Sequence, residues 1–354
     1  MTAFLRPELL SAAAYHLEAI APELIKLDAN EFPYDLPPDF KQKLSAIVSG
    51  DLASHLYPDG IYQELKQAIA DYTALTPDYI SLGNGSDELI RSLLLISCLG
   101  RGGILLAEPT FSMYGIVAQT LGIAVFRVGR DRHWQADLDK AQALIERENI
   151  TAVFVVHPNS PTGNLLTGEE IAWLKSLPEH ILVVIDEAYF EFSGCSLISE
   201  LGNFANWVIL RTFSKGLRLA AYRVGYAIAN PVIIEALEKV RLPYNLPTIS
   251  ARAAQLVLDN RAELLAEIPE VLKGRDQLYQ GLINSGVQAW QSSANFVFCQ
   301  TGNDLAIAQQ MRSQGVLIRH MGGGLRISIG TPEQMVQFWR VWSEIKDLLK
   351  PHSP

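Results

Sequence analysis

The sequence contains little cysteine, and the cysteines it has do not form a pattern. Cys98, Cys195 and Cys299 are the three in the 354-residue chain, they lie far apart, and no Cys-x-x-Cys pair is present. Small domains that depend on disulfides carry several closely spaced cysteines. The spacing therefore argues against a disulfide framework, and we expect a reducing compartment.

Long apolar runs and an excess of positive charge are also missing. No stretch approaches the roughly 18 consecutive apolar residues that a transmembrane helix needs, and residues 1–33 hold no apolar core of the signal-peptide kind. The net charge is −9, which argues against a nucleic-acid or anionic-membrane partner but leaves room for a small anionic substrate in a local pocket. We expect a cytoplasmic protein that binds neither nucleic acid nor membrane.

Two common site patterns are incomplete or absent. The seven histidines include no HExxH sequence and no close pair, so no metal site is expected. The stretch 83–88, GNGSDE, begins like a dinucleotide-binding loop but lacks its third glycine. Dehydrogenase and metalloenzyme functions therefore have little support.

The apolar residues fall into short runs separated by segments with helical spacing. Runs rich in Val, Ile and Leu, apolar on both faces, are typical of parallel strands covered by helices on both sides. The expected fold class is α/β, with a mostly parallel seven-stranded central sheet flanked by helices. The seven runs are 79–83, 103–108, 124–129, 151–158, 181–188, 207–213 and 224–229.

From about Pro231 the pattern changes to a long helical stretch, followed by short strands and a final helix. This change predicts a second, smaller α+β domain. We divide the chain into an N-terminal arm that packs with the small domain (1–30), a large domain (31–235) and a small C-terminal domain (236–354).

Polar residues follow several of the predicted strands, and ligands of such sheets bind at the carboxyl ends of the strands. Gly85 permits close backbone approach, while Ser86 and Asp87 begin a helix whose free amides could hold an anion. An ordinary helix N-cap would have the same sequence. Phe111, after the second strand, either covers a planar ligand or packs in the core.

Two further strand ends carry polar groups. Asn159 and Ser160 lie in the turn PNSPTGN, and Asp186 lies at the mouth of an apolar strand. A buried aspartate there needs a cationic or hydrogen-bonding partner, because an unpaired buried charge is costly. A pyridinium nitrogen would be such a partner.

The most informative run is ILRTFSKGLRLAAYRVGYAIA, 209–229, which places Lys215 beside hydroxyl residues just past a buried strand. A partly desolvated lysine has a lowered pKa and can act as a nucleophile. Thr212 and Ser214 stand just before it, and Arg223 follows eight residues later. A Schiff-base lysine beside phosphate ligands suits pyridoxal 5′-phosphate (PLP), although a surface lysine in a β–α loop would fit this run equally well.

Taken in order, these motifs resemble the aspartate-aminotransferase-like superfamily of PLP-dependent enzymes of fold type I over nearly the whole chain. Within that superfamily the sequence is most similar to the histidinol-phosphate aminotransferases. Motifs at both ends carry the second resemblance: LDANEFP (27–33), YPDG (57–60), SSANFVF (292–298), VLIRH (316–320) and LRISIG (325–330).

The resemblance assigns roles to the residues that would hold the cofactor ring in the large domain. Lys215 would form the covalent link to PLP and later carry the substrate proton, Asp186 would keep the ring nitrogen protonated, and Tyr189 would contact the 3′-oxygen. Phe111 would stack on the ring. The family usually has asparagine directly before Pro-Thr-Gly, where this chain has Ser160, so either Ser160 or Asn159 makes that contact.

The resemblance also implies phosphate and subunit contacts. The cofactor phosphate would be held by the two residues that follow Gly85 and by three residues near Lys215. These residues are Ser86, Asp87, Thr212, Ser214 and Arg223. Tyr57 matches a family tyrosine that reaches the cofactor phosphate from the partner subunit, which implies a homodimer with shared active sites.

Substrate binding is implied for a further group of residues. Arg326 would bind the carboxylate of glutamate or 2-oxoglutarate, and Arg319 would help to bind a substrate phosphate. Asn30 would lie near the entrance, and Tyr15 would close over the phosphate.

The implied reaction is transamination of L-histidinol phosphate with 2-oxoglutarate, which gives imidazole-acetol phosphate and glutamate in histidine biosynthesis. An aromatic amino-acid aminotransferase is the main alternative, and a threonine-phosphate decarboxylase is a more distant one. A binding protein that keeps the fold without the chemistry is disfavoured because Lys215, Asp186 and Arg223 are all present.

Overall fold

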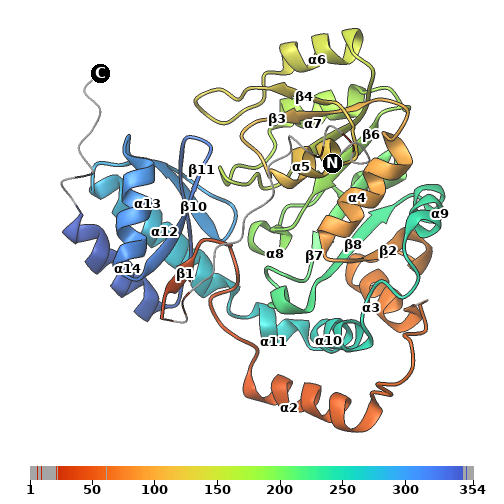
Figure 1. Ribbon diagram of the computed structural model, residues 1–354, viewed down its shortest axis with the longest axis horizontal. Coiled ribbons are helices and arrows are strands. Elements are labelled where there is room, and N and C mark those ends of the chain that lie inside the picture. The colour runs from red at the N-terminus through yellow and green to blue at the C-terminus, as the bar shows by residue number, and fades with distance from the viewer. Residues whose placement is uncertain are drawn as a thin grey trace.

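The computed structural model describes residues 23–60 and 62–345, together with residues 6, 9, 21 and 348. Its strands form two separate sheets, one of seven strands and one of five. Figure 1 shows the five-stranded sheet and its helices on the left, beside the larger body that contains the seven-stranded sheet.

All seven predicted strands of the large sheet are present, and they lie in the order β2-β8-β7-β6-β5-β3-β4. Only β8 runs antiparallel to its neighbours, so the prediction of a mostly parallel sheet is confirmed. The strands are β2 (Ile80–Asn84), β3 (Gly103–Ala107), β4 (Val125–Val128), β5 (Ile150–Val156), β6 (Leu182–Asp186), β7 (Trp207–Thr212) and β8 (Val224–Ala229).

Helices cover both faces of this sheet, because alternate residues of its buried strands point to opposite sides. In β5, Val153 and Val155 pack into one apolar cluster, whereas Phe154 and Val156 pack into another. The first cluster includes residues of α3 (Gln63–Thr73), α6 (Leu138–Arg147), α7 (Gly168–Ser176) and α10 (Thr248–Asp259). The second includes residues of α4 (Ser86–Ser97), α5 (Met113–Thr120) and α9 (Pro231–Val240).

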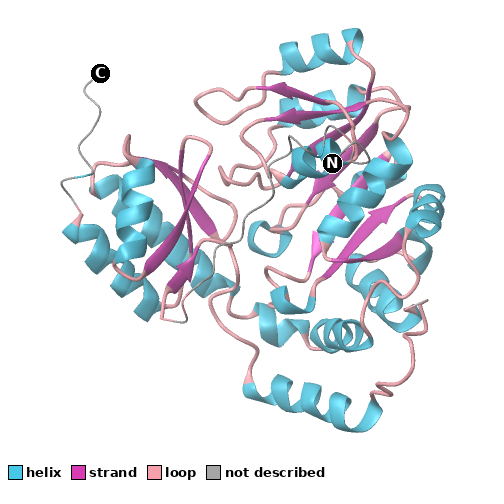
Figure 2. Cartoon of the chain, viewed as in Figure 1, coloured by secondary structure: helices cyan, strands magenta, loops and turns pink. Residues whose placement is uncertain are grey.

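The five-stranded sheet has the order β1-β11-β12-β10-β9, and its helices lie around it (Figure 2). Its first strand, β1 (Ile25–Leu27), lies parallel to β11, so the start of the described chain joins the C-terminal body. The other elements are β9 (Gln288–Trp290), β10 (Phe296–Gln300), β11 (Val316–Met321), β12 (Gly324–Ser328), α12 (Ile268–Asn284), α13 (Asp304–Ser313) and α14 (Pro332–Glu344).

The apolar packing changes from one body to the other later in the chain than residue 235. Leu264, in α11 (Arg261–Leu265), belongs to a cluster of the large sheet, whereas Ile268 belongs to the cluster of the small sheet. Helix α10 lies beneath the large sheet in Figure 1. The division at 235 stays a prediction, and we propose a later boundary, near residue 266.

Smaller elements complete the described chain, among them α2 (Pro38–Ala46) and α8 (Phe190–Ser193). Four short segments of other helical type are Ile47–Asp51, Pro77–Tyr79, Ile198–Gly202 and Ala220–Tyr222. Within the described ranges, no helix has the length and apolarity to span a bilayer.

Candidate active site

One cavity, of about 320 Å³, opens between the carboxyl ends of the large-sheet strands and the facing wall of the small sheet. Strand ends of a parallel sheet meet at one edge, which brings residues that are distant in sequence together. Most predicted site residues line this cavity. They are Asn30, Ser86, Asp87, Phe111, Ser160, Asp186, Tyr189, Thr212, Ser214, Lys215, Arg223, Arg319 and Arg326.

Lys215 lies in the turn after β7, and its side chain reaches across to the N-terminal segment. Its Nζ donates a hydrogen bond of 2.7 Å to the main-chain oxygen of Ala29. Burial lowers the pKa of Lys215; Tyr189 opposes this effect, and the nearby Arg326 charge adds to it. A lowered pKa makes the neutral, nucleophilic amine more accessible.

Asp186 is the last residue of β6 and is almost fully buried. The Tyr114 hydroxyl donates a 2.6 Å hydrogen bond to its Oδ2, and the Ala188 amide donates one of 3.0 Å to its Oδ1. Burial nevertheless raises the pKa of Asp186 to about 6. A cation placed beside this carboxylate would offset the cost of burying its charge.

The ring of Phe111 lies edge-on to Tyr114, with the ring centroids 5.4 Å apart. Phe111 lines the cavity and also packs against the cluster of α4 and α5. Phe111 therefore packs against the core, and its cover of a planar ligand in the cavity stays a prediction.

An anion cradle forms where α4 begins. Ser86 and Asp87 start the helix after Gly85, which has a φ of +75°. Arg223 donates to Ser214 Oγ at 3.1 Å and to Asp87 Oδ2 at 3.3 Å. Free amides and the positive end of the helix dipole, together with a guanidinium, suit a phosphate dianion.

Gly85 is required for this cradle to close. A methyl group at its position would lie 2.4 Å from Arg223 Nη2, and the backbone conformation disfavours a side chain as well. On the other side, Thr212 Oγ1 accepts from the Ser214 amide at 3.1 Å and lies 3.0 Å from Ser214 Oγ. The two hydroxyls are thereby held at the mouth of β7.

Tyr189 is held by the N-terminal segment. Asn30 Nδ2 donates a 2.9 Å hydrogen bond to the Tyr189 hydroxyl oxygen, and Ser328 Oγ lies 2.9 Å from Asn30 Oδ1. Asn30 is buried and has a left-handed φ of 55°. Asn30 thus links the ring beside Lys215 to β12 of the small sheet.

Ser160 and Asn159 face different surroundings. Ser160 lines the cavity, and its hydroxyl accepts a 2.9 Å hydrogen bond from Arg326 Nη1. The Asn159 amide group bonds to Thr110, Thr162 and the main-chain oxygen of Pro109. These bonds use both amide hydrogens of Asn159 within its turn, so we propose that Ser160 is the residue that faces a ligand.

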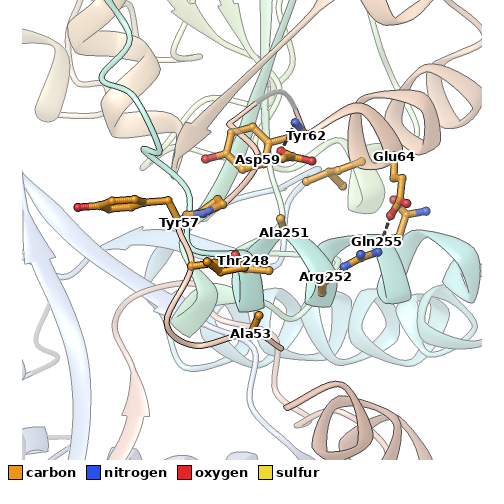
Figure 3. A pocket seen from close by; sticks show the side chains of 12 residues that line it. Ala53, Tyr57, Asp59, Tyr62, Glu64, Thr248, Ala251, Arg252 and Gln255 are labelled. Atoms are coloured by element: carbon orange, nitrogen blue, oxygen red, sulfur yellow. Dashed lines mark hydrogen bonds and ion pairs between the residues drawn. The ribbon is translucent and has the colours of Figure 1, made fainter. Parts of the chain in front are cut away.

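Tyr57, another predicted site residue, lies away from this cavity. Tyr57 is 81% exposed and its ring stacks on Tyr244, with the centroids 4.8 Å apart. It borders a second groove, of about 250 Å³, and Figure 3 shows its ring extending away from the other labelled side chains there. Tyr15 lies outside the described residues.

Sequence reasoning missed several residues of the cavity. Tyr114, the hydrogen-bond donor to Asp186, lies in α5 three residues after Phe111, and this nearness in sequence is a weak signal. Lys26, Asp28 and Met321 also line the cavity. Lys26 and Asp28 alternate with the buried Leu27, which is the pattern of a strand with one face toward a site.

A further carboxyl group lies beneath the lysine turn. Glu191 in α8 packs so closely on Gly216 that a methyl group there would lie 2.5 Å from Glu191 Cβ. Its Oε2 is buried and accepts no hydrogen bond. Burial raises the pKa of Glu191 to about 7, although the Arg211 charge opposes the shift.

The residues of the cavity fit PLP. Its phosphate suits the cradle at α4, its ring nitrogen can supply the cation that Asp186 needs, and its aldehyde is a partner for the Lys215 amine. In the described part of the chain, no group of three His, Cys, Asp or Glu side chains is placed to hold a metal ion.

The chain matches the family described as aminotransferase class I and II over residues 22–340. It is 52% identical to the histidinol-phosphate aminotransferase of Thermosynechococcus vestitus (strain NIES-2133 / IAM M-273 / BP-1), with 96% of each chain covered. It is 50% identical to the enzyme of that name from Synechococcus sp. (strain JA-2-3B'a(2-13)), with 94% of this chain and 95% of the relative covered.

Among solved structures, the chain resembles histidinol-phosphate aminotransferase from Sinorhizobium meliloti in complex with pyridoxal-5′-phosphate. The TM-score is 0.85 at 24% identity, and 98% of both chains is covered. A Thermus thermophilus aspartate aminotransferase double mutant gives a TM-score of 0.78 at 21% identity, with 92% of this chain and 91% of the other covered. These likenesses confirm the predicted fold, that of the PLP-dependent transferases of fold type I.

Glu191 should make stability depend on pH. Between its ordinary pKa of 4.5 and the raised value of about 7, the unfolded chain ionises while the folded chain stays neutral. The stability contributed by the neutral carboxyl is therefore complete below pH 4.5 and is lost as the pH rises through 7. Relative to wild type, Glu191→Gln should gain stability across this range, by at most about 3 kcal/mol.

Thermal unfolding of both proteins at pH 4, 6 and 8 measures this difference. Glu235→Gln is the matched control, because Glu235 is an exposed glutamate paired with Lys239 at the surface. A difference between Glu191→Gln and wild type that stays constant from pH 4 to 8 would contradict the raised pKa.

Proposed function

The chain belongs to the class I and II aminotransferases, and from this we propose that it transfers the amino group of L-histidinol phosphate to 2-oxoglutarate, with PLP as cofactor. The products would be imidazole-acetol phosphate and glutamate, in histidine biosynthesis. One observation carries the proposal. A single cavity holds a lysine and a buried carboxylate on one side and Lys26, Arg319 and Arg326 on the other.

The residues that would hold PLP come from four strand ends of the large sheet. Ser86 and Asp87 at α4, with Arg223 and the hydroxyls of Thr212 and Ser214, would bind its phosphate. Phe111 would cover its ring. When bound, PLP supplies an electron sink for the electron pair released at the substrate Cα.

The protein's own groups would hold and move the protons. Asp186, ionised beside a cation, holds the proton on the ring nitrogen, and the Tyr114 hydrogen bond keeps its carboxylate in place. Lys215, with its lowered pKa, is suited to take the proton from the substrate Cα as a neutral amine. Tyr189, fixed by Asn30, orients its hydroxyl toward the same space.

Substrate binding would fall to the cations of the small sheet. Arg326 already donates to Ser160 Oγ and to the Asp28 main-chain oxygen, so its guanidinium is held in one plane. A planar guanidinium binds a carboxylate by two parallel hydrogen bonds, which suits glutamate and 2-oxoglutarate. Arg319 lies opposite Arg326 in the strand register and would add a second charge for a phosphate.

We infer that the active unit is a homodimer. Leu56, Tyr57 and Tyr244 are exposed; Leu56 and Tyr57 border the second groove (Figure 3), and the Tyr244 ring stacks on Tyr57. Exposed apolar groups gathered in one place favour a partner protein. A second copy would cover them and could bring Tyr57 to the phosphate cradle of its neighbour.

We also propose that the protein works in the cytoplasm. Its three cysteines are unpaired, and Cys98 and Cys299 are buried. Unpaired cysteines are consistent with a reducing compartment.

The amino-donor assignment predicts the outcome of single half-reactions. The PLP form is mixed separately with histidinol phosphate, glutamate and phenylalanine. Its cofactor absorbance band should disappear at least ~10-fold faster with histidinol phosphate or glutamate than with phenylalanine. The reason is that a phosphate or a second carboxylate can pair with the cations of the small sheet. Fast conversion by phenylalanine would instead indicate an aromatic aminotransferase, and release of carbon dioxide would indicate a decarboxylase.

Replacement of the lysine tests the catalytic assignment. Lys215→Ala should fold and hold PLP non-covalently, because the cradle and Asp186 remain, but turnover should fall by roughly 10²–10⁴-fold. Absorbance before and after dialysis measures the covalent link, and circular dichroism measures the fold. Lys41→Ala, at an exposed ion pair with Asp35, is the control. Near-normal turnover by Lys215→Ala would remove this residue from the mechanism.

A hybrid dimer tests whether Tyr57 acts across subunits. Lys215→Ala chains and Tyr57→Ala chains should each be poorly active at limiting PLP. Refolded together in equal amounts, they should regain about a quarter of wild-type activity, since half of the dimers would carry one intact site of two. If the mixture shows no more activity than the sum of its parts, Tyr57 does not act on the partner's site.

A further inference from the structure

The substrate side of the cavity is a wall whose composition follows from strand register. Leu27 in β1 lies opposite Ile318 in β11, and both side chains are buried in the small-domain core. Because neighbouring residues of a strand point to opposite faces, Lys26 and Asp28 face the same way as Arg319. Arg319 in turn lies opposite Arg326 in β12, on the same face. All four residues line the cavity.

This wall carries one carboxylate among three cations. Of the described residues that line the cavity, the acidic ones are Asp28, Asp87 and Asp186. Asp87 is paired with Arg223, and Asp186 accepts hydrogen bonds from Tyr114 and Ala188. Both lie on the cofactor side, so Asp28 is the acidic group of the substrate side.

The carboxylate of Asp28 has unused acceptor capacity. Its Oδ1 is buried and accepts no hydrogen bond, and the Lys26 ammonium lies 3.5 Å from it, beyond good hydrogen-bond distance. The Asp28 side chain is 13% exposed and lines the cavity, and Oδ1 contributes none of that surface, so Oδ2 is the oxygen that a ligand N–H group can reach.

The main chain around Asp28 is fixed by the site itself. Arg326 Nη2 donates to the Asp28 carbonyl at 2.7 Å, and Lys215 Nζ donates to the next carbonyl, that of Ala29, at the same distance. The residue is therefore held in place by the groups that would bind substrate and cofactor, while its Oδ2 stays on the side of the cavity.

We propose that Asp28 is a specificity-determining residue that accepts a hydrogen bond from the imidazole N–H of the amino donor. The proposal rests on the proposed function and names the group that distinguishes its substrate from other amines. Imidazole offers an N–H donor and can carry a positive charge, whereas a phenyl ring offers neither. Three cations and one carboxylate together fit a donor with a phosphate at one end and an N–H heterocycle at the other.

The test compares two phosphorylated amines that differ only in the ring. Histidinol phosphate carries imidazole, and phenylalaninol phosphate carries phenyl in its place. Half-reaction rates with each, followed by the cofactor absorbance, give a preference ratio for every variant. Wild type should prefer the imidazole compound, and Asp28→Ala should lower the preference ratio at least ~10-fold, because sites that hydrogen-bond a substrate group discriminate strongly against its absence.

Three companion variants separate this role from others. Asp28→Asn keeps an acceptor oxygen and should retain part of the preference. Arg319→Ala should slow both phosphorylated amines and leave the ratio near its wild-type value, since both carry the phosphate. Lys26→Met tests whether Asp28 acts only by holding its lysine neighbour. Circular dichroism and the absorbance of bound PLP report whether each variant is folded.

An unchanged ratio in Asp28→Ala, in an enzyme that converts histidinol phosphate, overturns the role of Asp28 and leaves the proposed function standing. An equal loss of preference in Lys26→Met also overturns it, because the lysine would then be the discriminating group. A wild-type protein that converts neither phosphorylated amine overturns the proposed function, and the role of Asp28 with it, before any variant is needed.

Discussion

The segment Asp28–Asn30 is the constraint on which the rest of the site depends. Its three consecutive carbonyl groups accept hydrogen bonds from Arg326, Lys215 and Asn295, and the Asn30 side chain donates to Tyr189. Arg326 and Asn295 belong to the small domain, while Lys215 and Tyr189 belong to the large sheet. Three main-chain acceptors of one short segment thus connect both bodies at the cavity. A shift of this segment would disturb the lysine, the carboxylate-binding arginine and the ring contact together.

Charge distribution explains how an acidic protein can bind anions. The chain carries a net charge of −9, yet Lys26, Arg223, Arg319 and Arg326 all line one cavity. Arg326 donates to the Ser160 hydroxyl and to the Asp28 carbonyl, and Arg223 donates to the Ser214 hydroxyl. Neutral acceptors position a guanidinium without cancelling its charge. The local field can therefore oppose that of the whole molecule.

The central sheet and most of the cofactor side could be predicted from sequence, because both depend on local patterns. Apolar runs mark buried parallel strands, and polar residues directly after them mark the ligand edge. This pattern predicts that Lys215, Asp186 and Ser86 lie together.

The substrate wall could not be predicted in the same way. Strand β1 has three residues and pairs with β11 nearly 300 positions later, and no local pattern encodes such a pairing. The boundary between the two bodies was harder still, because Pro243 and Pro247 interrupt the helices before α10 returns to the large sheet.

The two sides of the cavity therefore differ in how tightly the fold fixes them. Lys215, Asp186 and Ser86 stand at the ends of strands or at the start of a helix that is packed on both faces, so their positions follow from the central sheet. The wall of Lys26, Asp28, Arg319 and Arg326 stands on a separate sheet, whose edge strand is short and whose side chains face the cavity. Substitutions on that wall change the charges and hydrogen-bonding groups that meet the substrate without altering the core beneath, since the alternate residues Leu27 and Ile318 make that core. Substrate choice can thus change in this fold while the reaction chemistry stays the same. A carboxylate on the wall, such as Asp28, is a group through which such a change can occur.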